Sequence, residues 1–149
     1  MEIRKATFED LDLIFQWAND EDERKNSFNP EKIPYEDHCA WYKKKMESKE
    51  SVIYILMLND VPVGQCRLDF EGTKGLISYF VDKEYRGRGY GKKILSLVYE
   101  KVKDDFPDAA SFVAQVKEDN IPSQKVFLSL GYEETMNQEC RIREYRLEI

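Results

Sequence analysis

The sequence is poor in the residues from which metal and redox sites are built. It has one histidine and three cysteines in 149 residues. The cysteines, at positions 39, 66 and 140, are widely spaced, and no two of them form a Cys-x-x-Cys pair. A disulfide framework uses an even set of cysteines, and a structural zinc site uses about four ligands. We therefore expect reduced thiols, no bound metal and a cytoplasmic location.

Long hydrophobic runs are also absent. No apolar stretch approaches the roughly 20 residues of a membrane-spanning helix, and no basic segment followed by an apolar one opens the chain. We therefore expect no membrane attachment. The 149 residues suit a single domain, 1–149, which at this size buries roughly two thirds of the surface of its unfolded chain.

Positive charge is in the minority overall but is concentrated at one place. The formal net charge is −6, whereas a general nucleic-acid binder usually carries a broad basic face. We therefore expect no nucleic-acid partner. Residues 86–93 nevertheless combine four cations with three glycines; these are Arg86, Gly87, Arg88, Gly89, Gly91, Lys92 and Lys93. This segment predicts a local anion site.

Hydrophobic periodicity predicts strands and helices in alternation. Apolar and β-branched runs predict strands at residues 2–6, 52–58, 63–70, 76–81, 111–116, 132–137 and 141–148. Apolar residues at helical spacing predict helices that begin after Thr7, after Pro34, near Gly89 and after Asn120. The polar stretch 19–34 is predicted to be irregular. This order of elements indicates a mixed α/β fold.

Glycines between a strand and a helix can direct several backbone N–H groups at one anion. Two well-known phosphate loops fail here by counting. A Walker A loop that ends at Gly91 and Lys92 would require glycine at position 86 and serine or threonine at position 93. A dinucleotide fingerprint that starts at Gly87 would require its third glycine at position 92, which is lysine.

A third pattern fits. Arg86-x-x-Gly89-x-Gly91 resembles the (Q/R)-x-x-G-x-(G/A) acyl-CoA loop of the GNAT N-acetyltransferases. After one helix and one strand, "NIPSQKVFLSLGY" at 120–132 is similar to the family pattern N-x-x-(A/S)-x-x-x-(Y/F)-x-x-x-G-(F/Y). The two motifs stand in the family's order, and the resemblance covers essentially the whole chain.

The resemblance implies a fold and a donor. The GNAT fold has a central mixed, mostly antiparallel sheet of about seven strands flanked by about four helices, and its fourth and fifth strands splay apart. The donor is acetyl-CoA, whose pantetheine arm pairs with the end of the fourth strand. The implied CoA-binding residues are Tyr79, Phe80, Val81, Arg86, Gly87, Arg88, Gly89, Tyr90, Gly91, Lys92, Asn120, Ser123 and Phe127. A backbone N–H near Phe80 or Val81 is expected to face the thioester oxygen.

The sequence departs from the family at two positions that often carry proton transfer. Many members have glutamate five residues before the motif asparagine, where this chain has Gln115. Many have tyrosine at the Phe127 position, where it protonates the leaving thiolate. Neither glutamine nor phenylalanine can exchange a proton. We therefore consider His38, Glu118 and Tyr79 as catalytic candidates, because each has a titratable side chain; the alternative for His38 is a packing role.

The segment before the second strand is expected to shape the acceptor site. It resembles the corresponding part of GNAT members that acetylate amino sugars on nucleotides. The candidate substrate-binding residues are Trp17, Arg24, Phe28, Trp41, Arg67 and Gln115. Aromatic rings could stack on an acceptor and arginine could bind a phosphate, although the same aromatics could fill the core instead.

Several functional interpretations remain open from the sequence alone. The leading hypothesis is acetyl transfer to the primary amine of a small molecule, an amino sugar on a nucleotide. An acidic protein would instead favour a cationic amine, such as a polyamine, an aminoglycoside or a protein N-terminus. A CoA-binding module without turnover is the third possibility. An exposed last strand could support a homodimer.

Overall fold

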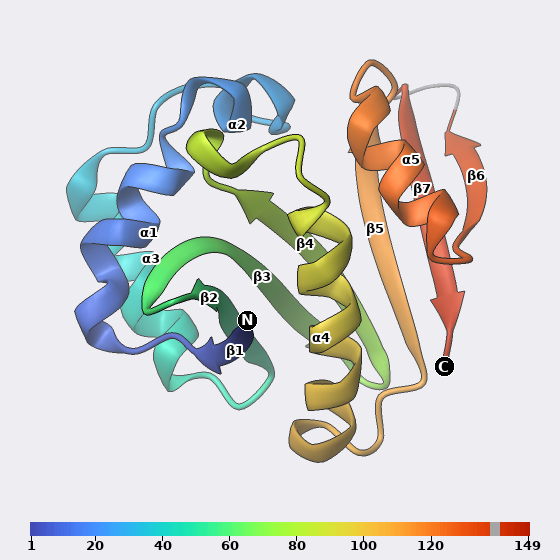
Figure 1. Cartoon of the computed structure of the whole chain (residues 1–149), viewed down its shortest axis with the longest axis horizontal. Coiled ribbons are helices and arrows are strands. Elements are labelled where there is room, and N and C mark those ends of the chain that lie inside the picture. The colour runs from blue at the N-terminus through green and yellow to red at the C-terminus, as the bar shows by residue number, and fades with distance from the viewer. Residues whose placement is uncertain (138–140) are drawn as a thin grey trace.

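The computed structural model describes residues 1–137 and 141–149, so Cys140 lies outside the described residues. Seven strands of the described part form one sheet in the order β1-β2-β3-β4-β5-β7-β6 (Figure 1). They are β1 (Glu2–Lys5), β2 (Ser51–Leu58), β3 (Val61–Glu71), β4 (Lys74–Val81), β5 (Ser111–Lys117), β6 (Glu133–Asn137) and β7 (Ile142–Glu148). Neighbouring strands are antiparallel except β4 and β5, which are parallel. The predicted mixed α/β sheet is confirmed.

Five α-helices accompany the sheet in the described part of the chain. They are α1 (Leu11–Ala18), α2 (Glu21–Asn26), α3 (Tyr35–Glu47), α4 (Tyr90–Asp105) and α5 (Ile121–Ser129). Two short 3-10 turns, η1 (Phe8–Asp10) and η2 (Lys83–Tyr85), precede α1 and follow β4. None of the helices in the described residues is long and apolar enough to cross a membrane.

Helix α2 falls in the stretch that was predicted to be irregular, so that prediction is wrong for residues 21–26. The helix buries none of its residues, and it therefore has no apolar periodicity to reveal it. Its N-cap does reveal it, because Asp20 accepts hydrogen bonds from the N–H groups of Asp22 at 3.0 Å and Glu23 at 3.1 Å.

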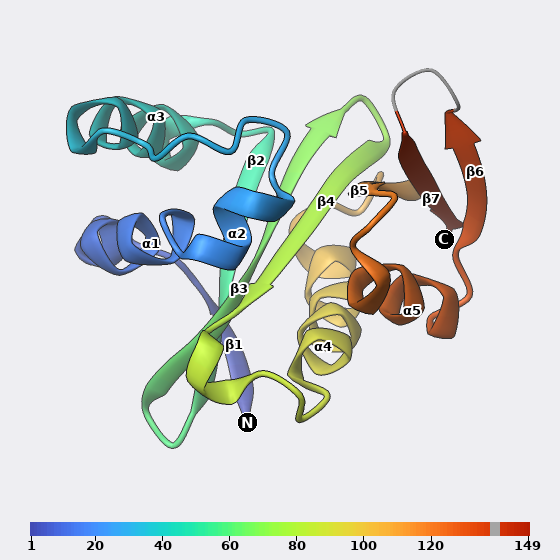
Figure 2. The ribbon, with the colours of Figure 1, turned by 90° about the horizontal axis from the view of Figure 1, so that it is seen from above.

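The helices cover both faces of the sheet and create two hydrophobic cores (Figure 2). On one face α4 and α5 pack over the larger core, in which Ile94, Leu95 and Val98 of α4 are fully buried. On the other face α1 and α3 enclose a smaller core, which includes Ile14 of α1 and Tyr42 of α3. Because both faces are covered, β2 is apolar on both sides, and Val52 to Leu56 are all buried.

The sheet opens between β4 and β5. These strands pair only from Lys74 and Ser111 to Leu76 and Val113, and they diverge toward their C-terminal ends (Figure 1). Strand β3 continues to pair with β4 as far as Val81, and β7 continues to pair with β5 along its full length. Each side of the opening is therefore held by its own neighbour, as the predicted splay requires.

The last strand does not form an exposed edge, so the sequence-based reason for a homodimer is wrong. Strand β7 lies between β5 and β6 and pairs with both. The edge on this side is β6, which arrives earlier in the chain but pairs only with β7. A homodimer remains a prediction, and in the described part of the chain the strand edges of the sheet are β6 and β1.

Asp10 ties the first strand to the turn before α1. Its carboxylate accepts two hydrogen bonds from the Arg4 guanidinium, at 2.8 and 2.9 Å, and one from the Thr7 N–H at 2.8 Å. The hydrogen-bonded Arg4 lowers the pKa of Asp10 below its usual value. The native state therefore favours the ionised carboxylate.

We expect Asp10→Asn to lower the free energy of unfolding at neutral pH by about 1–2 kcal/mol, because the bidentate ion pair is lost. The contribution of Asp10 is present above the pKa of an unfolded aspartate, about 3.9, and is lost as the pH falls through the lower native value. The difference between variant and wild type should therefore shrink in acid. Urea unfolding at several pH values measures this.

Glu9→Gln is the matched control, because Glu9 is an exposed carboxylate in the same turn. It should change the unfolding free energy by less than about 0.5 kcal/mol. Equal effects of the two substitutions would contradict the assigned role of Asp10.

Candidate active site

The opening between β4 and β5 exposes backbone groups of β4. The Asp82 N–H donates to the Val63 carbonyl of β3 at 2.9 Å. Because the backbone groups of successive residues in a strand point to opposite edges, those of Phe80 also point toward β3, whereas those of Tyr79 and Val81 point into the opening. Val81 therefore offers an N–H at the place expected for the thioester oxygen, and Phe80 does not.

The glycine loop connects this edge of β4 to the N-terminus of α4. Gly87 and Gly89 have φ angles of 78° and 80°, which favour glycine strongly over other residues. Gly89 is the N-cap of α4. The first N–H groups of a helix have no partner within the helix and carry the positive end of its dipole. This turn can therefore receive an anion.

Gly91 brings the same helix against the side chain of Tyr79. A Cβ atom at Gly91 would lie 2.7 Å from Cε2 of the tyrosine ring, closer than side chains tolerate. Gly91 is therefore required for the close packing of α4 on β4. Gly87 and Gly89, in contrast, are required for their positive φ angles.

The Arg86 side chain is engaged within the protein. Its guanidinium donates to Asp22 at 2.8 Å, to Asp20 at 3.0 Å and to the Val81 carbonyl at 2.9 Å. It also lies over the Phe80 ring, 5.2 Å from its centroid. Arg86 thus joins the loop to the start of α2, so its backbone, rather than its guanidinium, is placed to meet an anion.

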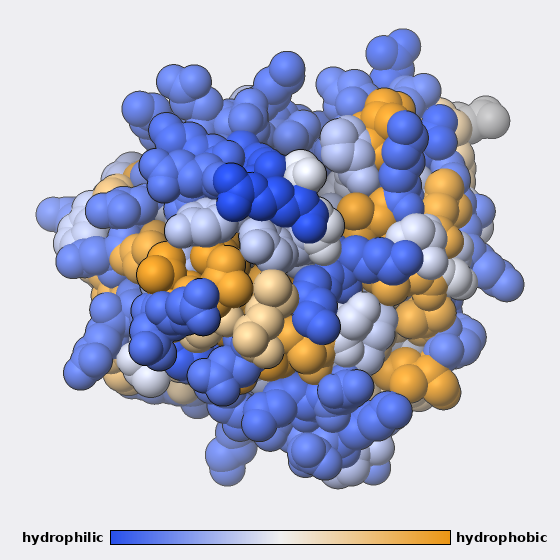
Figure 3. All heavy atoms as spheres, in the orientation of Figure 1, coloured by the Kyte–Doolittle hydropathy of each residue, from blue (hydrophilic) through white to orange (hydrophobic). Residues whose placement is uncertain are grey.

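The remaining cations of the loop are exposed. Arg88, Lys92 and Lys93 all lie at the surface, and Arg88 stacks over Tyr85 at 5.7 Å. In the space-filling view, hydrophilic side chains surround the loop that precedes α4 (Figure 3). Positive charge is thus available beside the N-terminus of α4, and Tyr90 forms the first turn of that helix.

A cavity of about 610 Å³ continues inward from the opening. It is bounded by α1, the α2 segment, α3, the ends of β4 and β5, and α5. The site residues predicted from sequence that line it are Arg24, Phe28, His38, Trp41, Arg67, Tyr79, Phe80, Gln115, Asn120, Ser123 and Phe127. These residues come from positions 24 to 127 of the chain, and the fold brings them together around one space.

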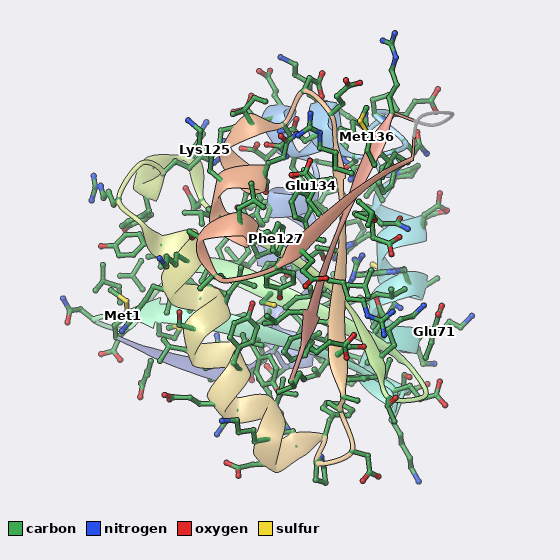
Figure 4. All side chains as sticks on the ribbon, turned by 90° about the vertical axis from the view of Figure 1, so that its right-hand side faces the viewer. Met1, Glu71, Lys125, Phe127, Glu134 and Met136 are labelled. Carbon is green, nitrogen blue, oxygen red and sulfur yellow. The ribbon has the colours of Figure 1, made fainter. Side chains whose placement is uncertain are left out.

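Tyr79 and Ser123 form a polar pair in this cavity. The Ser123 hydroxyl donates to the Tyr79 hydroxyl at 2.9 Å. Burial raises the pKa of Tyr79, so the phenol keeps its proton at neutral pH. Phe127 packs edge-on against the Tyr79 ring at 5.7 Å, and it lies on the side of α5 that faces the strands (Figure 4). The hydroxyl that the family often places at position 127 is therefore replaced nearby by that of Tyr79.

Asn120 is the N-cap of α5, but its side chain forms no capping hydrogen bond. It lines the cavity instead. The sequence-based expectation that Asn120 could both begin the helix and face a ligand fits this position.

Glu23 lines the same cavity, and sequence analysis missed it. Burial raises the pKa of its carboxyl group, while the nearby charges of Arg24 and Arg67 oppose that effect. Glu23 lies in α2, which has no apolar pattern. The only sequence signal was the Asp20-x-x-Glu23 spacing of a helix N-terminus, which could have identified the helix but not the role of the glutamate.

His38 is buried, with 2% of its surface exposed. Its Nε2 atom donates to the Leu11 carbonyl at 2.9 Å, and its ring packs between Phe15, Trp41 and Tyr42. Burial lowers the pKa of the imidazole. These contacts match the packing alternative, although one edge of the residue reaches the cavity.

Trp17 is buried away from the cavity lining. Its indole N–H donates to Asp82 at 3.0 Å, and its ring packs on Phe80 at 5.6 Å between centroids. These contacts brace the end of β4, which corresponds to the core-filling alternative for this residue.

The two predicted acceptor arginines differ in their surroundings. Arg24 donates to the backbone carbonyls of Ala18 at 2.7 Å and Asn29 at 3.0 Å, and to Ser27 at 3.0 Å, so it holds the acceptor-side loop together. Arg67 lies 5.2 Å from the centroid of the Trp41 ring and contacts Asp69 through Nε at 3.2 Å. Arg67 also lines the cavity.

Glu118 lies outside the main cavity. With Phe28, Asp119 and Arg141 it lines a second cavity of about 480 Å³. The structure therefore does not bring this catalytic candidate together with Tyr79. Among the residues that the structure describes, no group of three or more histidine, cysteine or acidic side chains could hold a metal ion.

Comparisons with known proteins agree with this architecture. The chain is 25% identical over 123 residues to the protein named uncharacterized N-acetyltransferase YfmK from Bacillus subtilis (strain 168), covering 83% of this chain and 78% of that one. A domain from Methanocaldococcus jannaschii DSM 2661 superposes with a TM-score of 0.83 at 25% identity, over 99% of this chain and 97% of that one. The Salmonella typhimurium protein yncA, whose structure contains acetyl-CoA, superposes with a TM-score of 0.80 at 21% identity, over 99% and 93%.

The family assignment follows from the match along the chain. The family described as "Acetyltransferase (GNAT) domain" matches residues 1–133, which include both motifs and the opening between β4 and β5. The chain therefore belongs to the GNAT acetyltransferase family, and it is an acetyl-CoA-dependent N-acetyltransferase of that type.

Proposed function

We propose that this protein transfers the acetyl group of acetyl-CoA to a primary amine that binds in the 610 Å³ cavity. One observation carries the proposal. The cavity is lined by residues of β4 and β5 where these strands part, and the turn at Gly89 follows the end of β4. A donor held in the opening would present its thioester to an amine on the far side.

The loop suits the donor's pyrophosphate. Backbone N–H groups from Gly87 to Gly91 and the N-terminus of α4 supply hydrogen bonds and positive potential. Arg88, Lys92 and Lys93 add charge at the surface. Arg86 contributes through its backbone, because its guanidinium holds Asp20 and Asp22.

The pantetheine arm would pair with the free edge of β4. The backbone groups of Tyr79 and the Val81 N–H point into the opening and provide the strand-like partner that such an arm needs, while the Val81 carbonyl accepts from Arg86. The Val81 N–H is then the group that stabilises negative charge on the carbonyl oxygen during attack. At this point the protein would orient the pantetheine arm and donate a hydrogen bond to the thioester oxygen.

Tyr79 is the best-placed proton donor for the departing thiolate. Its hydroxyl is protonated, lies in the cavity and accepts a hydrogen bond from Ser123. The Ser123 hydroxyl stabilises the phenolate that remains when Tyr79 gives its proton to the sulfur. Because a thiol of pKa near 8.5 leaves without full protonation, we expect this acid to contribute at the low end of the range for general acid catalysis.

The acceptor's finer identity rests on the cavity's side chains. Phe28 and Trp41 offer aromatic surface and Arg67 offers positive charge, which supports an amino sugar on a nucleotide. Glu23 in the same cavity supports a cationic amine. We place the amino-sugar nucleotide first, because an aromatic ring next to a guanidinium suits a base and a phosphate together.

Thiol release from acetyl-CoA tests the proposal. The purified protein should release CoA thiol with at least one amine from a panel of a 4-amino-sugar nucleotide, spermidine, an aminoglycoside and a peptide with a free N-terminus. The amine that works identifies the acceptor class. Binding of acetyl-CoA by calorimetry without release from any amine would favour a CoA-binding module.

We expect Gly89→Glu to weaken acetyl-CoA binding by more than roughly 100-fold, because it places a negative side chain at the N-terminus of α4 and strains a residue with positive φ. Calorimetric titration measures the change. Gly72→Glu is the control, since Gly72 also has a positive φ, 64°, but lies in the β3–β4 turn. The control should bind acetyl-CoA normally, and equal losses in both variants would contradict the assigned role of the loop.

We expect Tyr79→Phe to lower kcat by roughly 10²-fold, the low end of the range for a general acid, with little change in acetyl-CoA affinity. Tyr85→Phe is the control, because Tyr85 lies in η2 outside the cavity lining. A Tyr79→Phe variant with the wild-type kcat would show that the thiolate leaves without help from this hydroxyl.

A further inference from the structure

We propose that Glu23 binds the ammonium group of the acceptor and accepts its proton, in place of the glutamate that Gln115 replaces. The inference rests on the proposed acetyl transfer and adds the residue that prepares the amine. It also specifies that the acceptor binds with a cationic ammonium group next to Glu23, whatever the chemistry of the rest of the acceptor molecule.

The fold holds the Glu23 segment firmly against the opening. Asp20 caps α2 and also accepts from Arg86 of the donor loop at 3.0 Å. On the other side of the opening, Lys117 of β5 donates to the Lys25 carbonyl at 3.2 Å. Helix α2 lies at the end of the molecule where β4 and β5 diverge (Figure 1). These contacts fix Glu23 between the two strands that are expected to hold the donor.

The Glu23 carboxylate is not engaged by the protein. Its backbone N–H donates to Asp20 and its carbonyl accepts from Ser27, but no hydrogen bond or ion pair joins its carboxylate to another described residue. Arg24, the next residue, directs its guanidinium at backbone carbonyls. Arg67 packs on Trp41 and contacts Asp69. The half-buried carboxylate lines the cavity and keeps its acceptor capacity available for a ligand.

The charged groups around Glu23 set its proton affinity. Arg24, Arg67 and Arg86 favour the carboxylate, whereas Asp20 and burial favour the protonated acid. Burial is the largest influence, and the pKa is raised overall. Tyr79 lies close enough for the charge of Glu23 to raise the pKa of its hydroxyl further. Glu23 and Tyr79 therefore line the same cavity, and burial raises the pKa of both groups.

The other titratable residues of the region are less suited to receive this proton. The Nε2 atom of His38 already donates to the Leu11 carbonyl, and the ring is enclosed. Glu118 lines the second cavity. Asp37 is exposed on α3, where water solvates it. Among these carboxylates, Glu23 is the one that both lines the main cavity with Tyr79 and is half-buried.

The proposed step balances. The alkylammonium transfers one proton to the Glu23 carboxylate, and the nitrogen lone pair that is freed forms a bond to the acyl carbon. The carbon–sulfur bond then breaks, and its electron pair goes to the sulfur. The thiolate gains a proton from the Tyr79 hydroxyl, the second proton of the nitrogen restores that hydroxyl, and Glu23 returns its proton to solvent. The products are the amide, the thiol and one proton.

A carboxyl titration tests Glu23 without requiring turnover. In protein labelled with 13C-glutamate, the Glu23 carboxyl resonance is the one missing from Glu23→Gln. We expect it to titrate above the ordinary glutamate value of about 4.3, and to titrate lower when n-propylammonium chloride is added. The neutral isostere n-propanol should have no such effect. The titration is run with and without CoA. Its result for the Glu23 carboxyl can therefore be interpreted even if the protein does not transfer an acetyl group from acetyl-CoA.

Kinetics supply the second measurement. With the amine that supports thiol release, Glu23→Gln should lower kcat by roughly 10²–10³-fold and leave the KM for acetyl-CoA unchanged. The loss should diminish at alkaline pH, where more of the amine is already neutral in solution. Glu21→Gln removes an exposed carboxylate from the same helix and should match the wild type.

The outcomes separate the two proposals. Release from no amine by the wild type would reject acetyl transfer, while the carboxyl titration would still judge Glu23. A Glu23 resonance that titrates at the ordinary value, or that responds equally to n-propylammonium and n-propanol, would overturn the inference. Equal rates for Glu23→Gln and Glu21→Gln would overturn it as well. Because the Glu23 carboxylate forms no hydrogen bond or ion pair with the described residues, Glu23→Gln should melt no lower than the wild type, which separates lost chemistry from lost folding.

Discussion

The parting of β4 from β5 after Leu76 and Val113 is the constraint on which the rest of the structure depends. A parallel pair that continued to the end of β4 would satisfy the backbone groups of Tyr79 and Val81 and leave no space between the strands. Because β3 and β7 hold the two strands from their outer sides, the sheet can remain open there without losing its other pairings. The opening thereby provides both an unpaired strand edge and the entrance to the cavity.

Arg86 links the two ends of that opening. Its position in the loop matches the family motif, but its guanidinium reaches back to Asp20 and Asp22 at the start of α2. The donor loop and the helix that carries Glu23 are therefore one connected unit. An anion bound at the loop and an amine bound at Glu23 would both meet groups whose positions depend on this arginine.

Much of the fold and of the donor site could be predicted from the sequence, because both are encoded locally. Glycines at fixed spacing, a strand before them and an amphipathic helix after them need no long-range information. The acceptor side could not be predicted in the same way. Helix α2 is entirely polar, so its existence depends on the Asp20 cap and on Arg86, which lies 66 residues away from Asp20. Trp17 and His38 look like ligand-binding residues in the sequence, but only packing with Phe80, Phe15 and their neighbours reveals their structural contacts.

Residue-resolved amide exchange with and without acetyl-CoA tests the central claim most directly, namely that the donor occupies the free edge of β4. The Phe80 and Asp82 amides already face β3, whereas those of Tyr79 and Val81 face the opening. The account predicts that bound acetyl-CoA slows exchange at Tyr79 and Val81 and changes Phe80 much less. Bound acetyl-CoA that leaves exchange at Tyr79 and Val81 unchanged would contradict it.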